Sequence, residues 1–318
     1  MSAISELSTI HRVKAKTPEE KRLAAREAGR DNKAGYLFLL PWLIGLVLII
    51  GGPMIASLYL SFTNYSLIQA PEFIGLDNYV RMFNDPRLHK SIAVTFIYVL
   101  VGVPAQLIVA LAVAMLLNEG MKGLAFYRSI FYLPSMLGAS VAIAVLWRQM
   151  FEVDGLVNQV LRLFGFQATT SWIADPQWAL WTIILLHVWT FGSPMVIFLA
   201  GLRQIPGMYY EAASVDGASR WAQFRKITLP LLSPIIFFNL VLQIINAFQS
   251  FTQAYVVSNG TGGPADETLF YTLYLYQRGF VQFQMGYASA MAWLLVVIIA
   301  AFTAINFYFS KRWVFYGD

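Results

Sequence analysis

Amide and hydroxyl side chains recur at helical spacing within a long uncharged stretch, residues 231–257. Their offsets alternate between four and three, which places five of them on one face of a helix: Asn239, Gln243, Asn246, Ser250 and Gln253. Asn and Gln are costly to point at lipid, so this face must meet protein or water. Amides both donate and accept hydrogen bonds, as sugar hydroxyls do. The row therefore predicts either the lining of a solute pathway or a set of hydrogen bonds between helices.

Covalent and metal chemistry finds little support in the sequence. Cysteine is absent, which excludes disulfides, a thiolate nucleophile and a Cys-ligated metal. The histidines at positions 11, 89 and 187 are scattered and form no HExxH-like pair. No Gly-Lys dipeptide occurs, so the chain has no P-loop for ATP. We therefore predict no catalytic residue, no metal site and no cofactor bound by this chain.

The elements that position these side chains must be membrane helices. Hydrophobic residues make up 58% of the 318 residues and charged residues only 12%, against roughly a quarter charged in globular proteins. Uncharged, mostly apolar runs of about 20 residues predict spanning helices. Six such runs occur: Gly35–Ser61, Ser91–Leu117, Ser129–Trp147, Trp178–Leu202, Leu231–Val257 and Gly286–Ser310. The predicted fold class is an all-α polytopic membrane protein, with prolines inside the spans producing kinks.

The positive charges predict the orientation. With the N-terminus inside, 16 of the 22 Lys and Arg residues fall in cytoplasmic segments and 6 in external ones. This matches the positive-inside rule and predicts both termini in the cytoplasm. The net charge of +5 then reflects loop bias. The basic leader has no aromatic residue to stack on bases, which argues against nucleic-acid binding.

The predicted organisation follows from the spans. Residues 1–34 form a cytoplasmic leader, 35–61 the first transmembrane helix, 62–90 an external loop, 91–310 a five-helix core and 311–318 a cytoplasmic C-terminus. In the leader, Thr17, Pro18 and Glu20 predict a short capped helix up to about Arg26. That helix either contacts a membrane surface or partner, or is simply solvated.

Three external loops are too long for simple turns. Ile74–Phe83 has Asp77 as a cap before an amphipathic turn, Leu156–Phe164 is apolar enough to lie in the membrane interface, and Ser258–Pro264 is glycine-rich and must be irregular. These loops either dock a soluble partner or only cap the bundle.

The cytoplasmic loop 203–230 predicts two short helices at a sharp angle. Pro206 suits the first turn of a helix that runs through Glu211. Gly217 is a helix stop, and Ser219 caps a second helix through Lys226. Pro230 marks the entry into the membrane. A simple connection needs far fewer residues, so this loop predicts a knob that can transmit force.

The same loop resembles the EAA loop of ABC importer permeases. Its pattern is Glu-Ala-Ala, three residues, Gly, nine residues, then Ile-x-Leu-Pro. In that family the loop inserts into a groove of the nucleotide-binding subunit. The resemblance implies that coupling to the ATPase involves Tyr210, Glu211, Ala212, Ala213, Asp216, Gly217, Ile227, Leu229 and Pro230.

Other segments are similar to the carbohydrate-importing permeases of the maltose and glycerol-phosphate type. They are Phe73–Tyr79, Tyr127–Pro134 and Asn259–Pro264, and the resemblance extends from about residue 36 to the C-terminus. Matching that family's translocation site implies Gln243, Asn246 and Ser250 as pathway residues, joined by Ser135, His187, Trp189 and Phe191 at comparable places. Ala139 and Pro194 fall where related permeases can have polar or aromatic residues. For His187, a hydrogen bond between helices remains an equal alternative.

The resemblance implies a permease subunit of a binding-protein-dependent importer in the bacterial cytoplasmic (inner) membrane, which moves a carbohydrate by alternating access. Its implied partners are a second homologous permease, two subunits that bind ATP and Mg, an external solute-binding protein and membrane lipid. A permease for a non-sugar solute is the main alternative. An ion-coupled secondary transporter fits less well, because the spans contain no acidic residue and no internal repeat is found.

Overall fold

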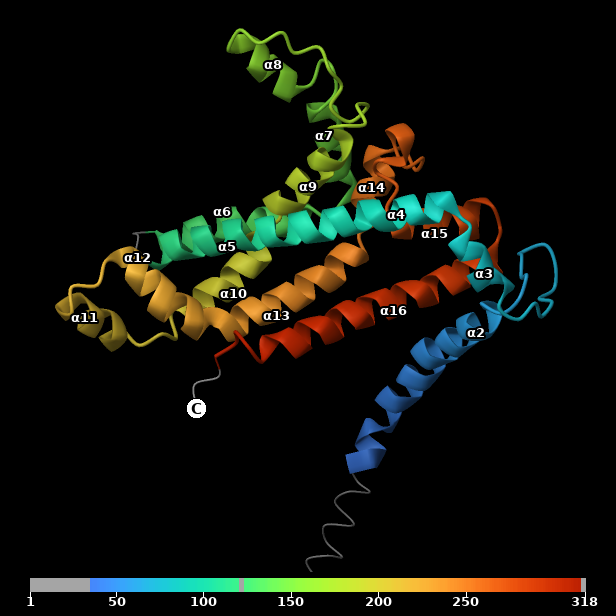
Figure 1. Cartoon of the computed structure of the whole chain (residues 1–318), viewed down its shortest axis with the longest axis horizontal. Helices are drawn as coiled ribbons and strands as arrows, with labels where there is room; N and C mark the ends of the chain where they lie inside the picture. Colours follow the sequence, from blue (N-terminus) through green and yellow to red (C-terminus); the bar gives the residue numbers. More distant parts are fainter. Residues whose placement is uncertain (1–34, 120–122, 316–318) are drawn as a thin grey trace, which may run out of the picture. The chain divides into compact units, whose positions relative to one another are not determined.

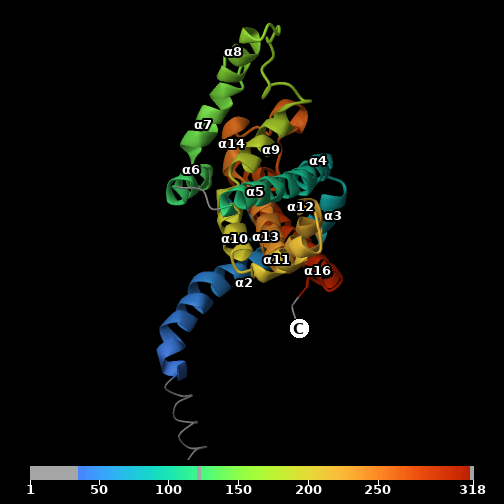
Figure 2. The ribbon, with the colours of Figure 1, turned by 90° about the vertical axis from the view of Figure 1, so that its left-hand side faces the viewer.

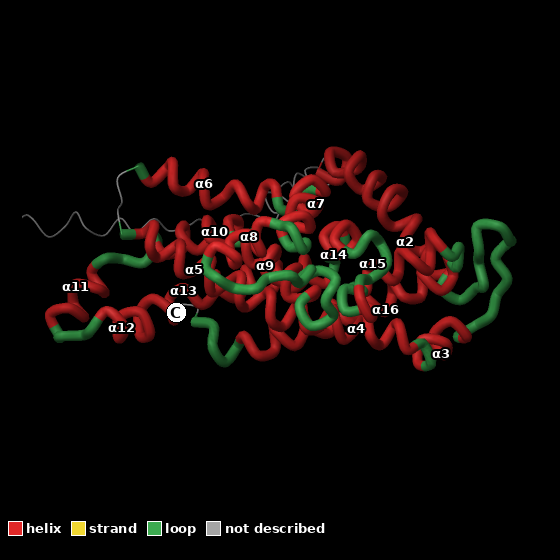
Figure 3. Tube along the Cα trace, turned by 90° about the horizontal axis from the view of Figure 1, so that it is seen from above, coloured by secondary structure: helices red, strands yellow, loops and turns green. Residues whose placement is uncertain are grey.

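The computed structural model describes residues 35–119 and 123–315, and these residues form helices joined by turns (Figure 3). Within this described part, extended pairing is limited to isolated bridges at Thr63–Phe73 and Ser66–Gln69. The all-α prediction is therefore confirmed. The predicted leader helix at residues 17–26 lies outside the described residues.

The chain divides into two compact units, one up to Ser57 and one from Leu58. The first unit contains most of a helix that runs from Gly35 to Leu60. This helix includes η1 (Leu46–Gly51) and continues in α2 (Gly52–Leu60). No side chain in its most apolar window is buried. A helix that is apolar all round and has no buried face is typical of a membrane span.

The second unit holds the remaining helices (Figure 1). They are α3 (Asp77–Phe83), α4 (Pro86–Ile97), η2 (Tyr98–Gly102), α5 (Val103–Asn118), α6 (Leu124–Leu137), α7 (Val141–Met150), α8 (Leu156–Leu163), α9 (Ala179–Trp189), α10 (Gly192–Leu202), α11 (Met208–Val215), α12 (Arg220–Gln223), η3 (Phe224–Thr228), α13 (Leu229–Phe248), α14 (Thr252–Val257), η4 (Pro264–Asp266), α15 (Tyr271–Tyr276), η5 (Gln277–Val281) and α16 (Met285–Ser310). Several labels join into single long helices: Pro86–Asn118 covers α4, η2 and α5, and Arg220–Phe248 covers α12, η3 and α13. At the centre of the unit α10 packs against α5, α6 and α13 (Figure 2).

Three predicted spans are not single helices. Residues 129–147 divide into α6 and α7, bent by 95°, and residues 178–202 divide into α9 and α10, bent by 41°. The fifth predicted span ends at Phe248, and α14 follows as a separate helix. Kinks at prolines were predicted inside these spans, but the helices break after Pro134, before Pro194 and after Phe248 instead. An uncharged run indicates that a segment lies in lipid, and it carries no information on the direction of the backbone.

Four helices are long and apolar enough to span a membrane, or up to six if each bent pair is one span. The prediction of six spans matches the larger number, and it stays a prediction together with the orientation. Figure 1 shows that α11, α12, the start of α6 and the end of α16 gather at one end of the second unit, while α3 and α15 lie at the other. Within the second unit, the described parts of the segments predicted to be cytoplasmic thus share one end.

Three of the four π-helical turns in the described residues precede prolines, and η5 does not. η1 ends two residues before Pro53, η2 two residues before Pro104, and η3 two residues before Pro230. Proline lacks an N–H, and its ring collides with the carbonyl four residues earlier, so a wider turn relieves the clash. At these three prolines the helix continues.

Asp85 joins α4 to α15, η5 and α16 at the end that holds α3 and α15. Its side chain is 7% exposed and caps α4 by accepting from the backbone N–H of Arg87 and of Leu88. Its Oδ2 accepts from the hydroxyl of Tyr274 at 2.7 Å, that of Tyr287 at 2.8 Å and Arg278 Nη2 at 3.1 Å. Burial disfavours the charge, but these hydrogen bonds outweigh burial and hold the pKa of Asp85 below its ordinary value. For Tyr274, burial and the hydrogen bond to Asp85 raise the hydroxyl pKa to about 12.

Of the three predictions for the external loops, one is confirmed, one is wrong and one stays a prediction. Asp77 is the first residue of α3 and not its cap, because Leu76 holds the cap position. The 258–264 loop is irregular as predicted, with positive φ at Asn259, Gly260, Gly262 and Gly263. α8 exposes an apolar side, with Leu163 85% exposed, but its place in a membrane interface stays a prediction.

Candidate functional site

The breaks of the two bent helix pairs lie against each other. A Cβ on Gly138, at the end of α6, would lie 2.1 Å from Cγ2 of Thr190, at the end of α9. A Cβ on Gly192 would lie 2.6 Å from the backbone oxygen of Phe131. A side chain at Gly138 would collide with the Thr190 side chain, and one at Gly192 would collide with the backbone of α6, so glycine suits both positions.

Side chains from other helices satisfy the backbone groups that the breaks free. Gln106 on α5 donates from Nε2 to the backbone oxygens of His187 at 3.0 Å and Thr190 at 3.1 Å. Ser135 donates to the same Thr190 oxygen at 2.8 Å and accepts from the backbone N–H of Ser193 at 2.9 Å. An unpaired backbone group in a membrane costs several kcal/mol, so these contacts make the bend stable.

The α6–α7 break is supported in the same way. Gln253 on α14 donates from Nε2 to the backbone oxygen of Gly138 at 3.2 Å. Its Oε1 accepts from the Ser250 hydroxyl at 3.3 Å. Both breaks thus depend on a glutamine from a neighbouring helix.

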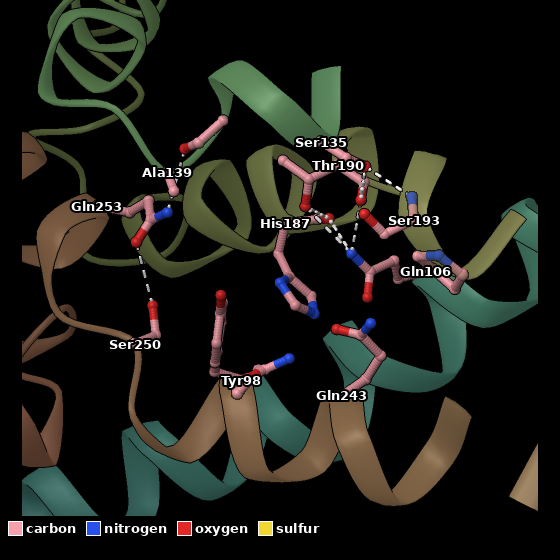
Figure 4. A pocket seen from close by; sticks show the side chains of 13 residues that line it. Tyr98, Gln106, Ser135, Ala139, His187, Thr190, Ser193, Gln243, Ser250 and Gln253 are labelled. Atoms are coloured by element: carbon pink, nitrogen blue, oxygen red, sulfur yellow. Dashed lines mark hydrogen bonds between the residues drawn. The ribbon is translucent and has the colours of Figure 1, made fainter. Parts of the chain in front are cut away.

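A cavity of about 290 Å³ opens beside these breaks (Figure 4). It is lined by Tyr98, Gln106, Ser135, Gly138, Ala139, His187, Thr190, Ser193, Pro194, Gln243, Asn246, Ser250 and Gln253. The lining contains amides, hydroxyls and one imidazole, and no Asp, Glu, Lys or Arg of the described part of the chain contributes to it. Such a surface offers many donors and acceptors without a fixed charge.

Two buried polar atoms in this lining have no hydrogen-bond partner among the described residues. They are Oε1 of Gln106 and Nε2 of His187. Buried polar groups are nearly always paired, so each unpaired atom needs an explanation. Both atoms belong to side chains that line the cavity, so a polar ligand or water there can supply the missing bonds.

The predicted pathway residues are partly brought together. Gln243, Asn246, Ser250, Ser135 and His187 line the cavity. Trp189 instead packs against Trp147, with ring centroids 6.0 Å apart, and Phe191 against Phe131 at 6.2 Å. His187 and Trp189 are two residues apart on α9, so they lie on different sides of that helix, and Phe191 lies at the break before α10.

Asn239 is also outside the cavity lining, although it has the same helical register as Gln243. It is 0% exposed, and both atoms of its amide group lack a partner among the described residues. The predicted face is therefore divided. Asn239, nearer the start of α13, is buried among the helices, and Gln243 and Asn246, nearer its end, line the cavity. Beyond Phe248 the regular helix has ended, and Ser250 and Gln253 reach the cavity from the turn and from α14.

Four polar lining residues were not predicted: Tyr98, Gln106, Thr190 and Ser193. Gln106 had a usable signal, because it is the only amide in the predicted span 91–117. Ala139 and Pro194, noted in the sequence for their position only, do line the cavity.

The loop 203–230 forms its first helix as α11, which begins at Met208 and not at Pro206. Gly217 adopts φ +75°, and the N–H of Ala218 reaches the oxygen of Ala213 at 2.8 Å, which ends the helix as predicted. The Ser219 hydroxyl accepts from the N–H of Ala222 and caps the next helix, also as predicted.

The second helix of this loop is not a separate short one. It runs without interruption into the fifth span, from Arg220 to Phe248, so Pro230 lies inside a helix and does not mark a boundary. Two side-chain contacts join α11 to it: the Tyr210 and Thr228 hydroxyls are 2.9 Å apart, and Gln223 Nε2 donates to Ser214 Oγ at 3.0 Å.

The residues predicted to couple to an ATPase separate by exposure. Glu211, Ala212, Asp216 and Gly217 are exposed on α11 and its end, whereas Tyr210, Ala213, Ile227, Leu229 and Pro230 are half-buried. The exposed group is free for a partner to contact, and the half-buried group belongs to the packing of the loop on the helix. Their coupling role stays a prediction.

No cluster of three or more His, Asp or Glu that could hold a metal occurs among residues 35–119 and 123–315. The prediction that the chain binds no metal or cofactor remains untested.

Comparison with known proteins gives consistent matches. A family model described as "Binding-protein-dependent transport system inner membrane component" matches residues 79–314. The chain is 55% identical over 293 residues to the probable ABC transporter permease protein YesP of Bacillus subtilis, covering 92% of this chain and 95% of that protein. It is 33% identical over 283 residues to the lactose transport system permease protein LacF of Rhizobium radiobacter, covering 87% and 94%. It is 31% identical over 290 residues to the trehalose/maltose transport system permease protein MalF of Thermococcus litoralis, covering 90% and 96%.

A solved structure shares the fold. It is a chain of a bacterial ABC transporter involved in the import of the acidic polysaccharide alginate, with a TM-score of 0.72 and 23% sequence identity. The match covers 91% of this chain and 99% of that chain.

Proposed function

The chain belongs to the family of binding-protein-dependent transport system inner membrane components, and from this premise we propose that it is one permease subunit of an ATP-driven importer of carbohydrates. The resemblance found in the loop 203–230 is thereby confirmed at the level of the family. The family and the apolar helices make the chain a multi-pass membrane protein, for which we propose the bacterial inner membrane.

One observation supports carbohydrate as the cargo. The cavity at the two helix breaks is lined by amides and hydroxyls without a charged side chain among the described residues. Such groups match the hydroxyls of a sugar, which both donate and accept. Relatives named for lactose and for trehalose/maltose point to the same class of solute.

We place ATP hydrolysis on partner subunits, because this chain has no P-loop. A second permease would complete the pathway, and an external binding protein would deliver the solute. A solved complex of the alginate importer includes a periplasmic binding protein, and this supports the last of these partners.

The geometry of the loop supports a simple route for coupling. α11 presents Glu211 and Ala212 at the surface and is tied to the helix Arg220–Phe248 by the Tyr210–Thr228 contact. The same helix carries Gln243 and Asn246 to the cavity. A displacement of α11 by a partner would therefore move the cavity wall through one continuous helix.

The test is uptake by the complete importer in proteoliposomes, with lactose, maltose and trehalose as labelled probes. Uptake should require ATP and the binding protein. Gly217→Pro and Glu211→Lys should leave ATPase activity and assembly intact and lower ATP-driven uptake by tenfold or more, ~1.4 kcal/mol of coupling or larger. Unchanged uptake in both variants would reject the coupling role of α11.

The alternatives have their own readouts in the same vesicles. An ion-coupled transporter would lose uptake when an ionophore dissipates the ion gradients, and an ATP-driven importer would not. If amino acids or polyamines are taken up and the saccharides are not, the cargo assignment is wrong while the importer assignment stands.

A further inference from the structure

Gln106 stands between the cavity and the break in the α9–α10 pair. It is 2% exposed and lies on α5, a helix that packs against α10. Its Nε2 has three acceptors within hydrogen-bond distance: the backbone oxygens of His187 and Thr190 and, at 3.1 Å, the Thr190 hydroxyl. Because two of these acceptors are backbone oxygens, the amide orientation is determined, and Oε1 must be the atom on the opposite side.

That oxygen has no partner among the described residues. Figure 4 shows it directed into the cavity, toward the space between His187 and Gln243. A buried acceptor left unpaired is destabilising, because it has lost its hydrogen bonds to water and gained none in return. His187 also lines this cavity, and its buried Nε2 is unpaired too among the described residues, so both unpaired atoms belong to side chains of the same cavity wall.

We propose that Gln106 is a ligand-contacting residue that ties the solute to the helix break: its Oε1 accepts a hydrogen bond from a solute hydroxyl while its Nε2 holds the bend between α9 and α10. This inference rests on the proposed function and adds a residue and a role that neither the relatives nor the loop motif assign. A hydroxyl suits the place because it can donate to Oε1 and at the same time accept from a neighbouring donor, such as an amide N–H of Gln243.

The arrangement has a consequence for the bend. A donor on Oε1 polarises the amide and strengthens the hydrogen bonds that its N–H groups make. Occupation of the cavity would therefore stabilise the packing of α5 against the end of α9. The solute would favour one geometry of the bend over others, as a ligand shifts a conformational equilibrium toward the state it binds better.

The test compares the loss of the Gln106 acceptor with the loss of each solute hydroxyl, separately and together, in the manner of a double-mutant cycle. The complete importer in proteoliposomes is assayed for uptake of lactose, maltose and trehalose, and the monodeoxy analogues of the best probe are used as competitors. We expect the wild type to discriminate against one monodeoxy analogue by about tenfold, because that analogue leaves one buried acceptor without its donor. Gln106→Met should bind the parent sugar more weakly and show no discrimination at that hydroxyl. The same binding protein is used with the wild type and with Gln106→Met, so its own preference among the analogues cancels when the two permeases are compared.

Two variants separate ligand contact from structure. Thr190→Val removes one acceptor of Nε2 and leaves Oε1 in place, so it should slow uptake of all analogues by the same factor. Asn239→Leu removes another buried unpaired amide, outside the cavity lining, and should leave the discrimination pattern unchanged. Should Gln106→Met fail to assemble, Gln106→Glu changes the acceptor without removing it, and the discrimination must then change at the same hydroxyl and at no other.

The outcomes are distinct. Discrimination that persists in Gln106→Met, or that stays the same at every hydroxyl in Gln106→Glu, would show that Oε1 binds only water, and the inference would be rejected while the importer function stands. A wild type that takes up no saccharide would reject the proposed cargo before the Gln106 variants are compared.

Discussion

Two polar clusters in this molecule are built in opposite ways. At Asp85, a single buried carboxylate receives five donors: two backbone N–H groups of α4, two tyrosine hydroxyls and one guanidinium. Around the cavity, the polar side chains are uncharged, and Gln106 Oε1 and His187 Nε2 receive none from the described residues. The first cluster is complete without a ligand, and the second is not.

The difference reflects the cost of burying each kind of group. A buried charge that lacks partners is penalised by several kcal/mol, so a carboxylate can persist only when it is fully paired. A neutral amide oxygen costs far less to leave unpaired, so the protein can fold with this oxygen unpaired until a ligand binds. A saturated cluster therefore indicates a fastening point, and an unsaturated one beside a cavity indicates a binding site.

The largest effect should come from removing the carboxylate. Asp85→Leu leaves the Arg278 guanidinium, two tyrosine hydroxyls and the first turn of α4 without their acceptor. Breaking a buried ion pair by removing one partner costs about 3–5 kcal/mol. Thermal unfolding of the purified importer complex should show a clear loss of stability, with no change in the sugar specificity of the molecules that remain folded.

The pH dependence provides the control for this comparison. The folded-state pKa of Asp85 lies below its ordinary value of 3.8, so its stabilisation is fully present above that value and is lost as the pH falls through the lower folded-state pKa. The stability difference between wild type and Asp85→Leu should be constant from neutral pH down to the ordinary value and shrink below it. A difference that already disappears near neutral pH would contradict the role given to this carboxylate.

The next effect concerns the cavity wall. Replacing Gln243 and Asn246 together with Leu removes two amides from the lining but leaves no buried group unpaired, because Asn246 is exposed and Gln243 half-buried. Uptake of the transported sugar should fall by about a hundredfold, ~2.7 kcal/mol. Assembly with the ATP-binding subunits and thermal stability should change little. Wild-type uptake kinetics in this variant would mean that the amide row is structural.

The smallest effect is expected at Asn239, which sharpens the comparison. It is buried with both amide atoms unpaired among the described residues, yet it does not line the cavity. Replacing an unpaired buried amide with an apolar group of similar shape is nearly neutral or stabilising, by about 1 kcal/mol. Asn239→Leu should therefore keep wild-type uptake and equal or exceed the wild-type unfolding temperature. A loss of uptake would extend the binding surface below the cavity.

Local sequence signals account for much of what was found. The helical class follows from long uncharged runs, which must be helical in lipid. The end of α11 at Gly217 and the cap at Ser219 follow from backbone requirements of single residues. These features depend on a few neighbours along the chain, so the sequence by itself determined them.

The cavity depended on tertiary structure. Gln106, Ser135 and Gln253 stabilise breaks that lie far from them along the chain, and each break exists only because those side chains satisfy its freed backbone groups. Hydropathy carries no information about such partners, so residues 129–147 and 178–202 were each predicted as one span with a proline kink, and the place of the breaks was not predicted. The family resemblance alone suggested Trp189 and Phe191 as pathway residues. The sequence by itself determined which side chains are polar within the membrane helices. The packing of the bent helices decided which of them face the cavity, because a helix can break in lipid only where another helix supplies the missing hydrogen bonds.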